Sequence, residues 1–454
     1  MSDFKKVLIA NRGEIARRII RTCRRLSIPT VAVYSDADRD ALFVREADEA
    51  VAIGPALVKK SYLDMENIIR AAKETGADAI HPGYGFLAEN SAFAERCVAE
   101  GITFIGPSAS VIRLMGDKIE ARRQMKAAGV AIVPGVDGAL SSVEEAIQAA
   151  QEIGYPVMLK ASAGGGGIGM QVVSSDDELE KAFASTAQRA GSYFGDDTLF
   201  LEKFIAAPRH IEVQIAADQH GNVVHLWERE CSVQRRNQKI IEEAPSPFLD
   251  ESRREALCQA AVRGARSIGY TNVGTMEFIV DEQGQFYFLE MNTRIQVEHP
   301  VTEEIAGVDL VEWQLRIAEG RPLQREALPS APQGHAIECR VYAEDPRTFM
   351  PSPGKIETLR LPDGVRLEFA VTEGDQVTPF YDPMIGKIIA HGANRPEAIR
   401  KMKEALGRCV VSGIKHNIPL LVNVMDHPDF QAGAYTTKFV ETVLKDCGQG
   451  EMRT

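Results

Sequence analysis

The chain has 454 residues, a length that suits about three domains, each large enough for its own core. Hydrophobic residues make up 44% and charged residues 26%, as in most globular proteins, and the formal net charge is −12. The sequence contains no long run of lysine or arginine. A net negative charge without such a run argues against binding to nucleic acid or to an anionic membrane surface.

The cysteines and the first residues of the chain bear on its compartment. The seven cysteines are scattered and include no C-x-x-C pair. This distribution indicates reduced thiols and argues against a disulfide framework or a zinc site. The first residues do not fit a secretory signal, and no run of about 18 apolar residues predicts a membrane span. We therefore expect a cytoplasmic protein with no membrane or nucleic-acid partner.

Short apolar runs alternate with helical patterns at the start of the chain. The predicted strands cover residues 6–10, 30–35, 50–54, 78–83 and 103–107, and the predicted helices cover 13–26, 62–75 and 90–100. Such alternation predicts a parallel sheet covered by helices. Ligands of these sheets bind at the carboxyl ends of the strands, where the polar segments 11–14 and 81–85 fall.

A second region begins near Lys118 and a third after residue 323. In the second, the predicted helices cover 118–128 and 142–153, and the predicted strands cover 198–204, 210–217, 222–228, 274–280 and 285–291. The third region combines short strands with helices near its end. The sequence contains no low-complexity segment and no solenoid-type repeat.

A glycine-rich loop, residues 164–169, lies between two predicted strands. Glycine lets backbone amides approach phosphate closely, so the loop can be a phosphate-binding flap. It is not a Walker A loop, which requires G-K-[ST] entering a helix. The alternative is a flexible hairpin turn. Lys160, just before the loop, is either aimed at phosphates or a solvated strand lysine.

Two carboxylates are predicted to face each other across a hairpin. If the turn centres on Gln283-Gly284, Glu277 and Glu290 lie directly opposite, and Asn292 shares the face of Glu290. Like charges in this position are destabilising without a cation. Two carboxylates and an amide oxygen suit Mg²⁺ or Mn²⁺ bound together with substrate phosphates. The alternative is an exposed edge with two solvated glutamates.

The stretch 293–304 follows this hairpin and carries alternating polar residues. Arg294, Gln296 and Glu298 share one face if the chain stays extended. A guanidinium beside a carboxylate can hold a small planar anion while the carboxylate takes a proton. The alternative is a polar loop with surface ion pairs. Two further polar segments, which can equally be solvated strands or loops, cover residues 209–214 and 229–243.

Taken together, eight motifs in order closely resemble those of biotin carboxylases, in the ATP-grasp superfamily. They read VLIANRGEIA, HPGYGFLAEN, MGDK, LKASAGGGG, CSVQRRNQK, LEMNTRIQVEHPVTE, ECRVYAEDP and FYDPMIGK. The resemblance implies a mixed α/β and α+β fold in three domains. These are an N-terminal parallel-sheet (pre-ATP-grasp) domain over 1–115, a central ATP-grasp domain over 116–330 with a mobile lid near 131–204, and a C-terminal biotin carboxylase domain over 331–450.

The resemblance also implies roles for individual residues. Those expected at ATP are Lys118, Lys160, Gly166, Gly167, Glu202, Lys203, Phe204, Ile205, His210 and Asn237. Two Mg²⁺ or Mn²⁺ ions would be held by Glu277 and Glu290, with Asn292 in support. Those expected around bicarbonate are Lys239, Arg294, Gln296, Val297 through its backbone, and Glu298 as the base. Arg340 would face the ureido oxygen of biotin, and Asp382 would belong to the biotin region.

Three positions depart from the pattern of this family. Ile168 and Asn237 stand where a basic residue and a histidine are common, which could alter nucleotide affinity. Ala163 replaces a common glycine and would stiffen the flap. None of the three removes an expected metal ligand or the expected base.

The activity implied is ATP-dependent carboxylation of carrier-bound biotin by bicarbonate, through carboxyphosphate, in a biotin-dependent carboxylase such as acetyl-CoA carboxylase. The chain has no A-M-K-M biotinylation segment. A biotin carboxyl carrier protein and a carboxyltransferase on separate chains are therefore the expected partners, and a homodimer is expected from the family. Another ATP-grasp ligase and a non-catalytic nucleotide-binding subunit are the alternatives. The final acceptor can be acetyl-CoA, pyruvate or another acyl-CoA.

Overall fold

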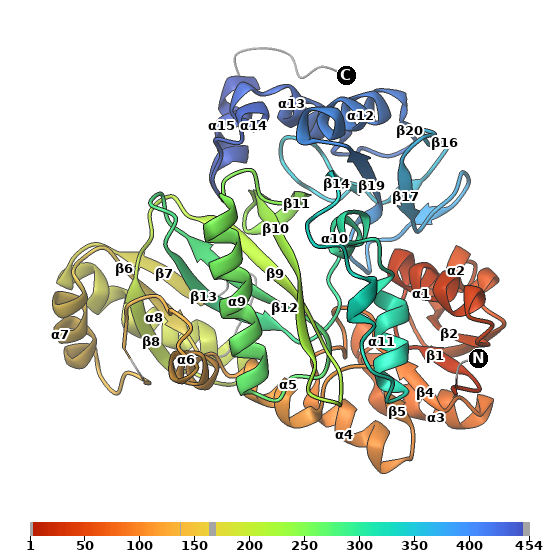
Figure 1. Cartoon of the computed structure of the whole chain (residues 1–454), viewed down its shortest axis with the longest axis horizontal. Coiled ribbons are helices and arrows are strands. Elements are labelled where there is room, and N and C mark those ends of the chain that lie inside the picture. The colour runs from red at the N-terminus through yellow and green to blue at the C-terminus, as the bar shows by residue number, and fades with distance from the viewer. Residues whose placement is uncertain (1–2, 137, 163–168, 448–454) are drawn as a thin grey trace.

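The N-terminal region of the computed structural model, which describes residues 3–136, 138–162 and 169–447, is a five-stranded parallel sheet in the order β3-β2-β1-β4-β5 (Figure 1). Its strands are β1 (Val7–Ile9), β2 (Thr30–Ser35), β3 (Glu49–Gly54), β4 (Ala79–His81) and β5 (Thr103–Phe104). Its helices are α1 (Gly13–Arg25), α2 (Leu42–Glu46), α3 (Met65–Thr75), α4 (Ser91–Ala99) and α5 (Ala109–Gly116). The predicted parallel sheet is confirmed.

A smaller sheet projects from the body on the left of Figure 1. It is antiparallel in the order β7-β6-β8, with β6 (Val157–Ala161), β7 (Met170–Val173) and β8 (Leu199–Lys203). Helices α7 (Val143–Ile153) and α8 (Asp176–Phe194) pack on it and share a separate hydrophobic core with it. Helix α6 (Lys118–Ala127) precedes this unit.

The largest element is an eight-stranded sheet in the order β13-β12-β9-β10-β11-β14-β19-β17. Its strands are β9 (Arg209–Ala217), β10 (Val223–Arg235), β11 (Gln238–Ala244), β12 (Asn272–Val280), β13 (Phe286–Asn292), β14 (His335–Tyr342), β17 (Arg366–Phe369) and β19 (Met384–Gly392). Helix α9 (Glu251–Ser267) packs on β9 and β10. The sheet continues from the central region into the C-terminal region through the pairing of β11 with β14.

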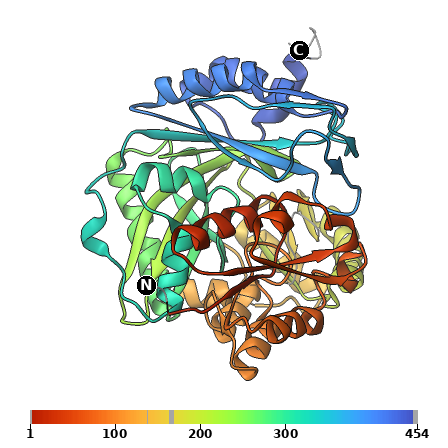
Figure 2. The same cartoon turned by 90° about the vertical axis from the view of Figure 1, so that its right-hand side faces the viewer.

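The remaining elements surround this sheet. Helices α10 (His299–Ala306) and α11 (Leu310–Ala318) lie between it and the N-terminal region, while α12 (Arg395–Arg408), α13 (Ile418–Asp426), α14 (Pro428–Ala432) and α15 (Phe439–Cys447) cover the C-terminal end. Four short strands pair apart from it: β15 (Gly354–Lys355) with β18 (Gln376–Val377), and β16 (Thr358–Arg360) with β20 (Val410–Ser412). Figure 2 shows the N-terminal region below the C-terminal helices, and α1 contacts β17 and β19. No helix among the described residues combines the length and the apolar content that crossing a membrane requires.

The hairpin of β12 and β13 has the predicted pairing but not the predicted turn. Glu277 lies directly opposite Glu290, as expected. The turn, however, occupies 282–284, because Asp281 N–H donates to Gln285 O at 2.9 Å and Gly284 has a φ of +80°. A three-residue loop with glycine in the left-handed region is a common hairpin solution. A β-bulge next to the Glu277–Glu290 pair then restores the register that a two-residue turn would have given.

A buried carboxylate, Glu243, ties β11 to the C-terminal helices. It accepts hydrogen bonds from Arg395 Nε at 2.7 Å and from Tyr435, and its Oε2 lies 2.6 Å from His335 Nε2. Burial alone would raise the pKa of Glu243, but the hydrogen bonds from His335 and Arg395 outweigh it and lower the pKa from 4.5 to about 2. The ionised form is therefore stabilised by the fold.

Replacing Glu243 with glutamine is expected to lower the free energy of unfolding by about 3 kcal/mol at neutral pH. A lowered carboxyl pKa contributes stability above the unfolded value near 4.5, and this stability is lost as the pH falls towards 2. The difference between wild type and variant should therefore shrink over that window, as measured by denaturant unfolding at several pH values. Glu404→Gln, at an exposed i,i+4 pair with Arg400, is the control and should cost under about 1 kcal/mol. Equal loss in both variants would contradict the assignment.

Candidate active site

The two opposed carboxylates of the β12–β13 hairpin lie at one end of the site. Glu277 is buried and Glu290 is half-buried. Burial and the neighbouring Glu277 raise the pKa of Glu290, as expected for like charges that share a poorly solvated position. A divalent cation bound by both would offset this repulsion, and carboxylate oxygens are ligands that Mg²⁺ and Mn²⁺ prefer. The residues present therefore fit such an ion.

Glu277 is oriented by four neighbouring side chains. Its Oε1 accepts hydrogen bonds from Lys239 at 2.9 Å, Asn292 at 2.9 Å and Gln296 at 2.8 Å, and its Oε2 lies 2.9 Å from His210 Nε2. Burial opposes the charge, but Lys239 and His210 lower the pKa of Glu277 well below its usual value. The carboxylate is thus ionised and fixed in place, which a metal ligand requires.

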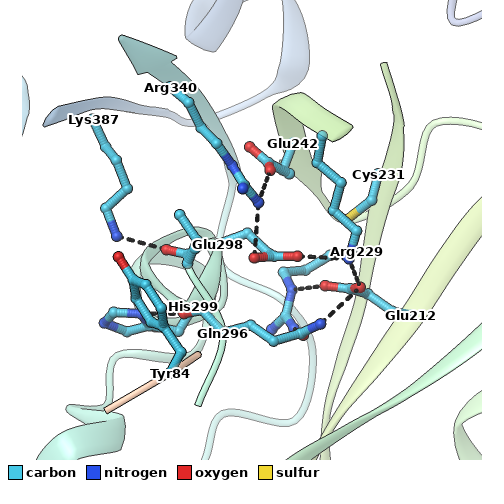
Figure 3. A network of polar contacts seen from close by, with 12 residues as sticks. Tyr84, Glu212, Arg229, Cys231, Glu242, Gln296, Glu298, His299, Arg340 and Lys387 are labelled. Atoms are coloured by element: carbon cyan, nitrogen blue, oxygen red, sulfur yellow. Dashed lines mark hydrogen bonds and ion pairs between the residues drawn. The ribbon is translucent and has the colours of Figure 1, made fainter. Parts of the chain in front are cut away.

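Lys239 joins this pair of carboxylates to a further carboxylate, Glu298. Its Nζ donates to Glu212 at 2.6 Å, to Glu277 at 2.9 Å and to Glu298 at 2.7 Å. Glu298 also accepts a hydrogen bond from Arg340 Nη2 at 3.0 Å (Figure 3). Although burial favours the neutral acid, Lys239 and Arg340 lower the pKa of Glu298 strongly. The candidate base is therefore available in its deprotonated form.

Arg340 itself lies between two acids of different character. Besides Glu298, it contacts Glu242 of β11, whose Oε1 is 2.5 Å from Arg340 Nη2. Burial raises the pKa of Glu242 to about 7, although Arg340 opposes this shift. The guanidinium is therefore held from two sides, on β14 at the C-terminal half of the large sheet (Figure 3).

Arg294 and its neighbours close the other side of the site. Strand β13 ends at Asn292, so the predicted extended alternation of residues 294, 296 and 298 does not continue as a strand. All three side chains nevertheless reach the same cluster. Arg294 donates to Asn292 Oδ1 and to Glu89 Oε2, both at 2.8 Å, while Gln296 donates to Glu277. Helix α10 starts directly after this segment, with Pro300 in its first turn, where proline is favoured.

A fully buried arginine, Arg229 on β10, forms hydrogen bonds with side chains that contact Lys239 and Glu277. Its guanidinium donates to Glu212 at 2.6 Å and to Gln296 at 2.5 Å, and its other acceptors are Gln214, Thr275 and Thr302. Both Arg229 and Glu212 have 0% exposure. Because a buried charge is tolerated only when paired and hydrogen-bonded, this network fixes Gln296 and, through Glu212, Lys239.

The residues expected at ATP fall mostly around the small sheet and α6. Lys160 on β6 is only 7% exposed and forms an ion pair with Glu202 on β8, which contradicts the alternative of a solvated lysine. Arg122 of α6 also donates to Glu202, at 3.0 Å. Lys118 follows the N-cap Asp117 of α6, and Glu290 counters the lowering of its pKa by burial. These groups thus connect the carboxylate pair to the small sheet.

Three further residues expected at ATP lie at the end of β8 and directly after it. Lys203 donates to the carbonyl of Gly154 at 2.5 Å, and the N–H of Phe204 donates to Pro156 O at 3.2 Å. Ile205 is half-buried beside them. The ammonium of Lys203 is therefore hydrogen-bonded to the backbone between α7 and β6. Gly166 and Gly167 lie outside the described residues, as do Ala163 and Ile168.

Two expected residues are not part of the cluster. Asn237 lies at the exposed tip of the β10–β11 hairpin, where Arg236 and Asn237 have φ values of 47° and 65°. Two successive left-handed residues define a type I′ turn, in which asparagine is favoured, so the backbone itself accounts for Asn237. Asp382 is exposed and accepts from the N–H of Met384 at 2.9 Å. Burial and Glu14 raise the pKa of Tyr84, and the charge of Asp382 adds to this shift.

Several groups of the site were missed from the sequence. They are Glu89 and Lys387, and also Glu212, Arg229 and Glu242, which were covered only by the two weak polar segments 209–214 and 229–243. Lys387 donates to the carbonyl of Val297 at 2.6 Å. A signal existed for Glu89 and Lys387, because both lie inside the quoted motifs HPGYGFLAEN and FYDPMIGK. For Arg229 on β10 and Glu242 on β11, the order of polar and apolar residues in the sequence does not indicate that they are buried.

Comparison with known families is consistent with this arrangement. Residues 117–326 match the ATP-binding domain of the carbamoyl-phosphate synthase L chain, which identifies an ATP-binding enzyme domain of that class. Residues 3–112 match the N-terminal domain of biotin carboxylase, and residues 338–442 match its C-terminal domain. The chain belongs to the biotin carboxylase family.

Individual relatives agree over nearly the whole length. Biotin carboxylase of Halalkalibacterium halodurans is 60% identical, over 97% of this chain and 98% of the relative. Among solved structures, a Campylobacter jejuni biotin carboxylase–β,γ-ATP complex superposes with a TM-score of 0.95 at 48% identity, covering 97% of this chain and 99% of the other. The biotin carboxylase domain dimer of Hydrogenobacter thermophilus 2-oxoglutarate carboxylase, with MgADP, ADP and bicarbonate, gives 0.93 at 50% identity, covering 97% and 98%.

Proposed function

We propose that this chain carboxylates biotin held on a carrier protein, using ATP and bicarbonate and releasing ADP and phosphate. The observation that carries the proposal is the position of Lys239, which contacts Glu277 at the metal end and Glu298 at the base end. These contacts support a metal-and-phosphate position next to a carboxylate base and two arginines. This combination is what activation of a small oxyacid by ATP needs.

At the nucleotide end, Lys118 and Lys160 hold the phosphates, and Glu277 and Glu290 hold Mg²⁺ or Mn²⁺, with Asn292 orienting Glu277. When bound, these ions supply charge neutralisation on the terminal phosphates. Glu202, Lys203, Phe204 and Ile205 line the base of the nucleotide, and His210 approaches the ribose.

At the other end, Arg294, Gln296, Lys239 and the backbone of Val297 bind bicarbonate. Glu298 takes the proton of bicarbonate, and the resulting oxygen attacks the γ-phosphorus of ATP while the bond to ADP breaks. The product, carboxyphosphate, separates into CO₂ and phosphate. The pKa of Glu298 is strongly lowered in the free site by Lys239 and Arg340 against burial. Anionic substrates that engage these two cations raise its basicity in the complex.

Biotin reacts beside Arg340. The released phosphate removes the proton from the ureido nitrogen, that nitrogen bonds to the carbon of CO₂, and Arg340 stabilises the negative charge on the ureido oxygen. Asp382 borders the biotin side. The Arg340 guanidinium contacts both Glu298 and Glu242, which keeps it directed at this position.

The same proposal covers organisation and partners. The domains are 1–115, 116–330 and 331–450, and the unit from 131 to 204, which has its own core in the small sheet, is a lid that excludes water from carboxyphosphate. The carrier and the carboxyltransferase are separate chains, the protein is a homodimer, and it works in the cytoplasm. Acetyl-CoA is one acceptor that the partner enzyme can use, as in fatty acid synthesis.

The test is an ATPase assay in which bicarbonate and free biotin are omitted in turn. ADP release is expected to require bicarbonate and to increase with biotin, and carboxybiotin should form in step. Ammonia or glutamine should not replace bicarbonate. ATP cleavage that needs an amine and ignores bicarbonate would show another ATP-grasp ligase, and tight ATP binding with no cleavage would show a non-catalytic subunit.

A further inference from the structure

A lysine that the proposed mechanism does not use, Lys387 on β19, lies deep in the junction of the three regions. Its side chain has 0% exposure. Its Nζ donates to the carbonyl of Val297 at 2.6 Å and lies 3.2 Å from Glu14 Oε1. A buried ammonium is stable only with such partners. One amine thus links β19, the segment before α10 and the start of α1.

The acid that pairs with Lys387 is itself held in position. Glu14, in the first turn of α1, is buried and accepts a hydrogen bond from the hydroxyl of Tyr84. Glu14 and Tyr84 belong to the two polar segments predicted at the carboxyl ends of β1 and β4. The N-terminal sheet therefore supplies a fixed counter-charge for an amine of the C-terminal region.

The backbone around Val297 is constrained at two successive carbonyls. Gln296 O accepts a hydrogen bond from His299 Nδ1 at 2.8 Å, and Val297 O accepts from Lys387. Because burial and the charge of Lys387 lower the pKa of His299, the ring is neutral and donates through Nδ1. In a trans peptide the N–H of Val297 points away from the carbonyl of Gln296. Among the described residues, that N–H forms no hydrogen bond.

The sheet register explains how the C-terminal region reaches this segment. Arg340 on β14 is directly opposite Lys387 on β19. Like charges in this position repel unless each has its own acceptor. Arg340 is directed to the side chain of Glu298, and Lys387 to the carbonyl of Val297. One cross-strand pair therefore contacts two consecutive residues of the bicarbonate segment.

We infer that Lys387 is a positioning residue for bicarbonate: it holds Val297 between Glu14 and α10 so that the free N–H of Val297 faces the anion beside Arg294. The inference rests on the proposed function, because it assigns the support of the bicarbonate position. It also gives the N-terminal region a part in the reaction through Glu14 and Tyr84.

The experiment compares Lys387→Met with wild type in bicarbonate-dependent ATP cleavage. Loss of one charge-assisted backbone hydrogen bond is expected to raise the KM for bicarbonate about tenfold, while the KM for ATP stays within about twofold. Lys403→Met is the control, because Lys403 forms a partly exposed ion pair with Asp426 on the outer helices. Its two KM values should be those of wild type.

A double variant, Lys387→Met with Glu14→Gln, separates positioning from general stability. Lys387→Met alone leaves Glu14 as a buried unpaired charge, which lowers the melting temperature. The second change removes that charge and should restore much of the melting temperature, while the KM for bicarbonate stays raised. If the KM returned to the wild-type value with the melting temperature, the effect would be structural and the inference wrong.

The remaining outcomes are also decisive. A bicarbonate KM unchanged in Lys387→Met, or a double variant that fails to fold, would overturn the inference and leave the proposed function intact. Wild-type enzyme that cleaves ATP without any requirement for bicarbonate would instead refute the proposed function.

Discussion

Glu298→Gln is expected to lower bicarbonate-dependent ATP cleavage by about 10³-fold while ATP affinity stays within about twofold. Glutamine keeps the shape and one acceptor for Lys239 and Arg340 but cannot take the proton of bicarbonate. Lys239 Nζ lies 2.7 Å and Arg340 Nη2 lies 3.0 Å from the carboxylate of Glu298, so two cations fix its position. Coupled ADP release measures turnover, and calorimetry with ATP measures binding.

The control for this variant is Glu404→Gln, a change of the same chemistry on the outer helix α12, which should leave turnover unchanged. Turnover within a few-fold of wild type in Glu298→Gln would exclude Glu298 as the base. A large loss of ATP affinity in the same variant would instead place the role of Glu298 at the nucleotide.

Glu290→Gln is expected to lower ATP cleavage by at least about 10²-fold and to raise the concentration of free Mg²⁺ or Mn²⁺ needed for half-maximal activity. Glu290 faces Glu277 across the hairpin, and burial with this like charge raises its pKa. A neutral amide removes half of the negative charge that would hold a divalent ion. Activity at varied free metal, together with Mn²⁺ binding followed by electron paramagnetic resonance, measures both effects.

A matched control lies in the same hairpin. Glu282 is exposed in the 282–284 loop, so Glu282→Gln should change neither metal affinity nor turnover. Removing metal with a chelator should stop ATP cleavage in wild type, and added Mg²⁺ should restore it. If Glu290→Gln bound Mn²⁺ with wild-type affinity, the metal site would have to lie elsewhere.

The main features of the fold could be predicted from the local order of polar and apolar residues in the sequence. Strand–helix alternation predicted the N-terminal parallel sheet, and an assumed turn at Gln283-Gly284 predicted that Glu277 faces Glu290. The predicted two-residue turn was wrong, since the loop has three residues, 282–284. The predicted pairing is nevertheless correct, because a β-bulge next to Glu277 compensates for the extra residue. Register near a turn depends on backbone choices that side-chain pattern does not determine.

Other parts of the site could not be predicted, because they depend on contacts between distant segments. Arg229 read as an ordinary polar residue, and the burial of Lys387 was not predictable even though it lies inside the motif FYDPMIGK, since lysine and arginine are rarely buried. In the structure both are fully buried and organise the backbone and side chains around Val297 and Gln296. Their role follows from partners that are far from them in the sequence.

The pairing of β11 with β14 has a consequence for dissection of the chain. The family matches end at residue 326 and resume at 338, which marks a boundary in sequence. Yet Ile241 pairs with Cys339 and Ala244 with Ala336 across it. A fragment cut in this gap would carry an open strand edge, a template for aggregation, and would separate Arg340 from Glu298. The two halves are therefore one cooperative folding unit, and neither is expected to be a usable module alone.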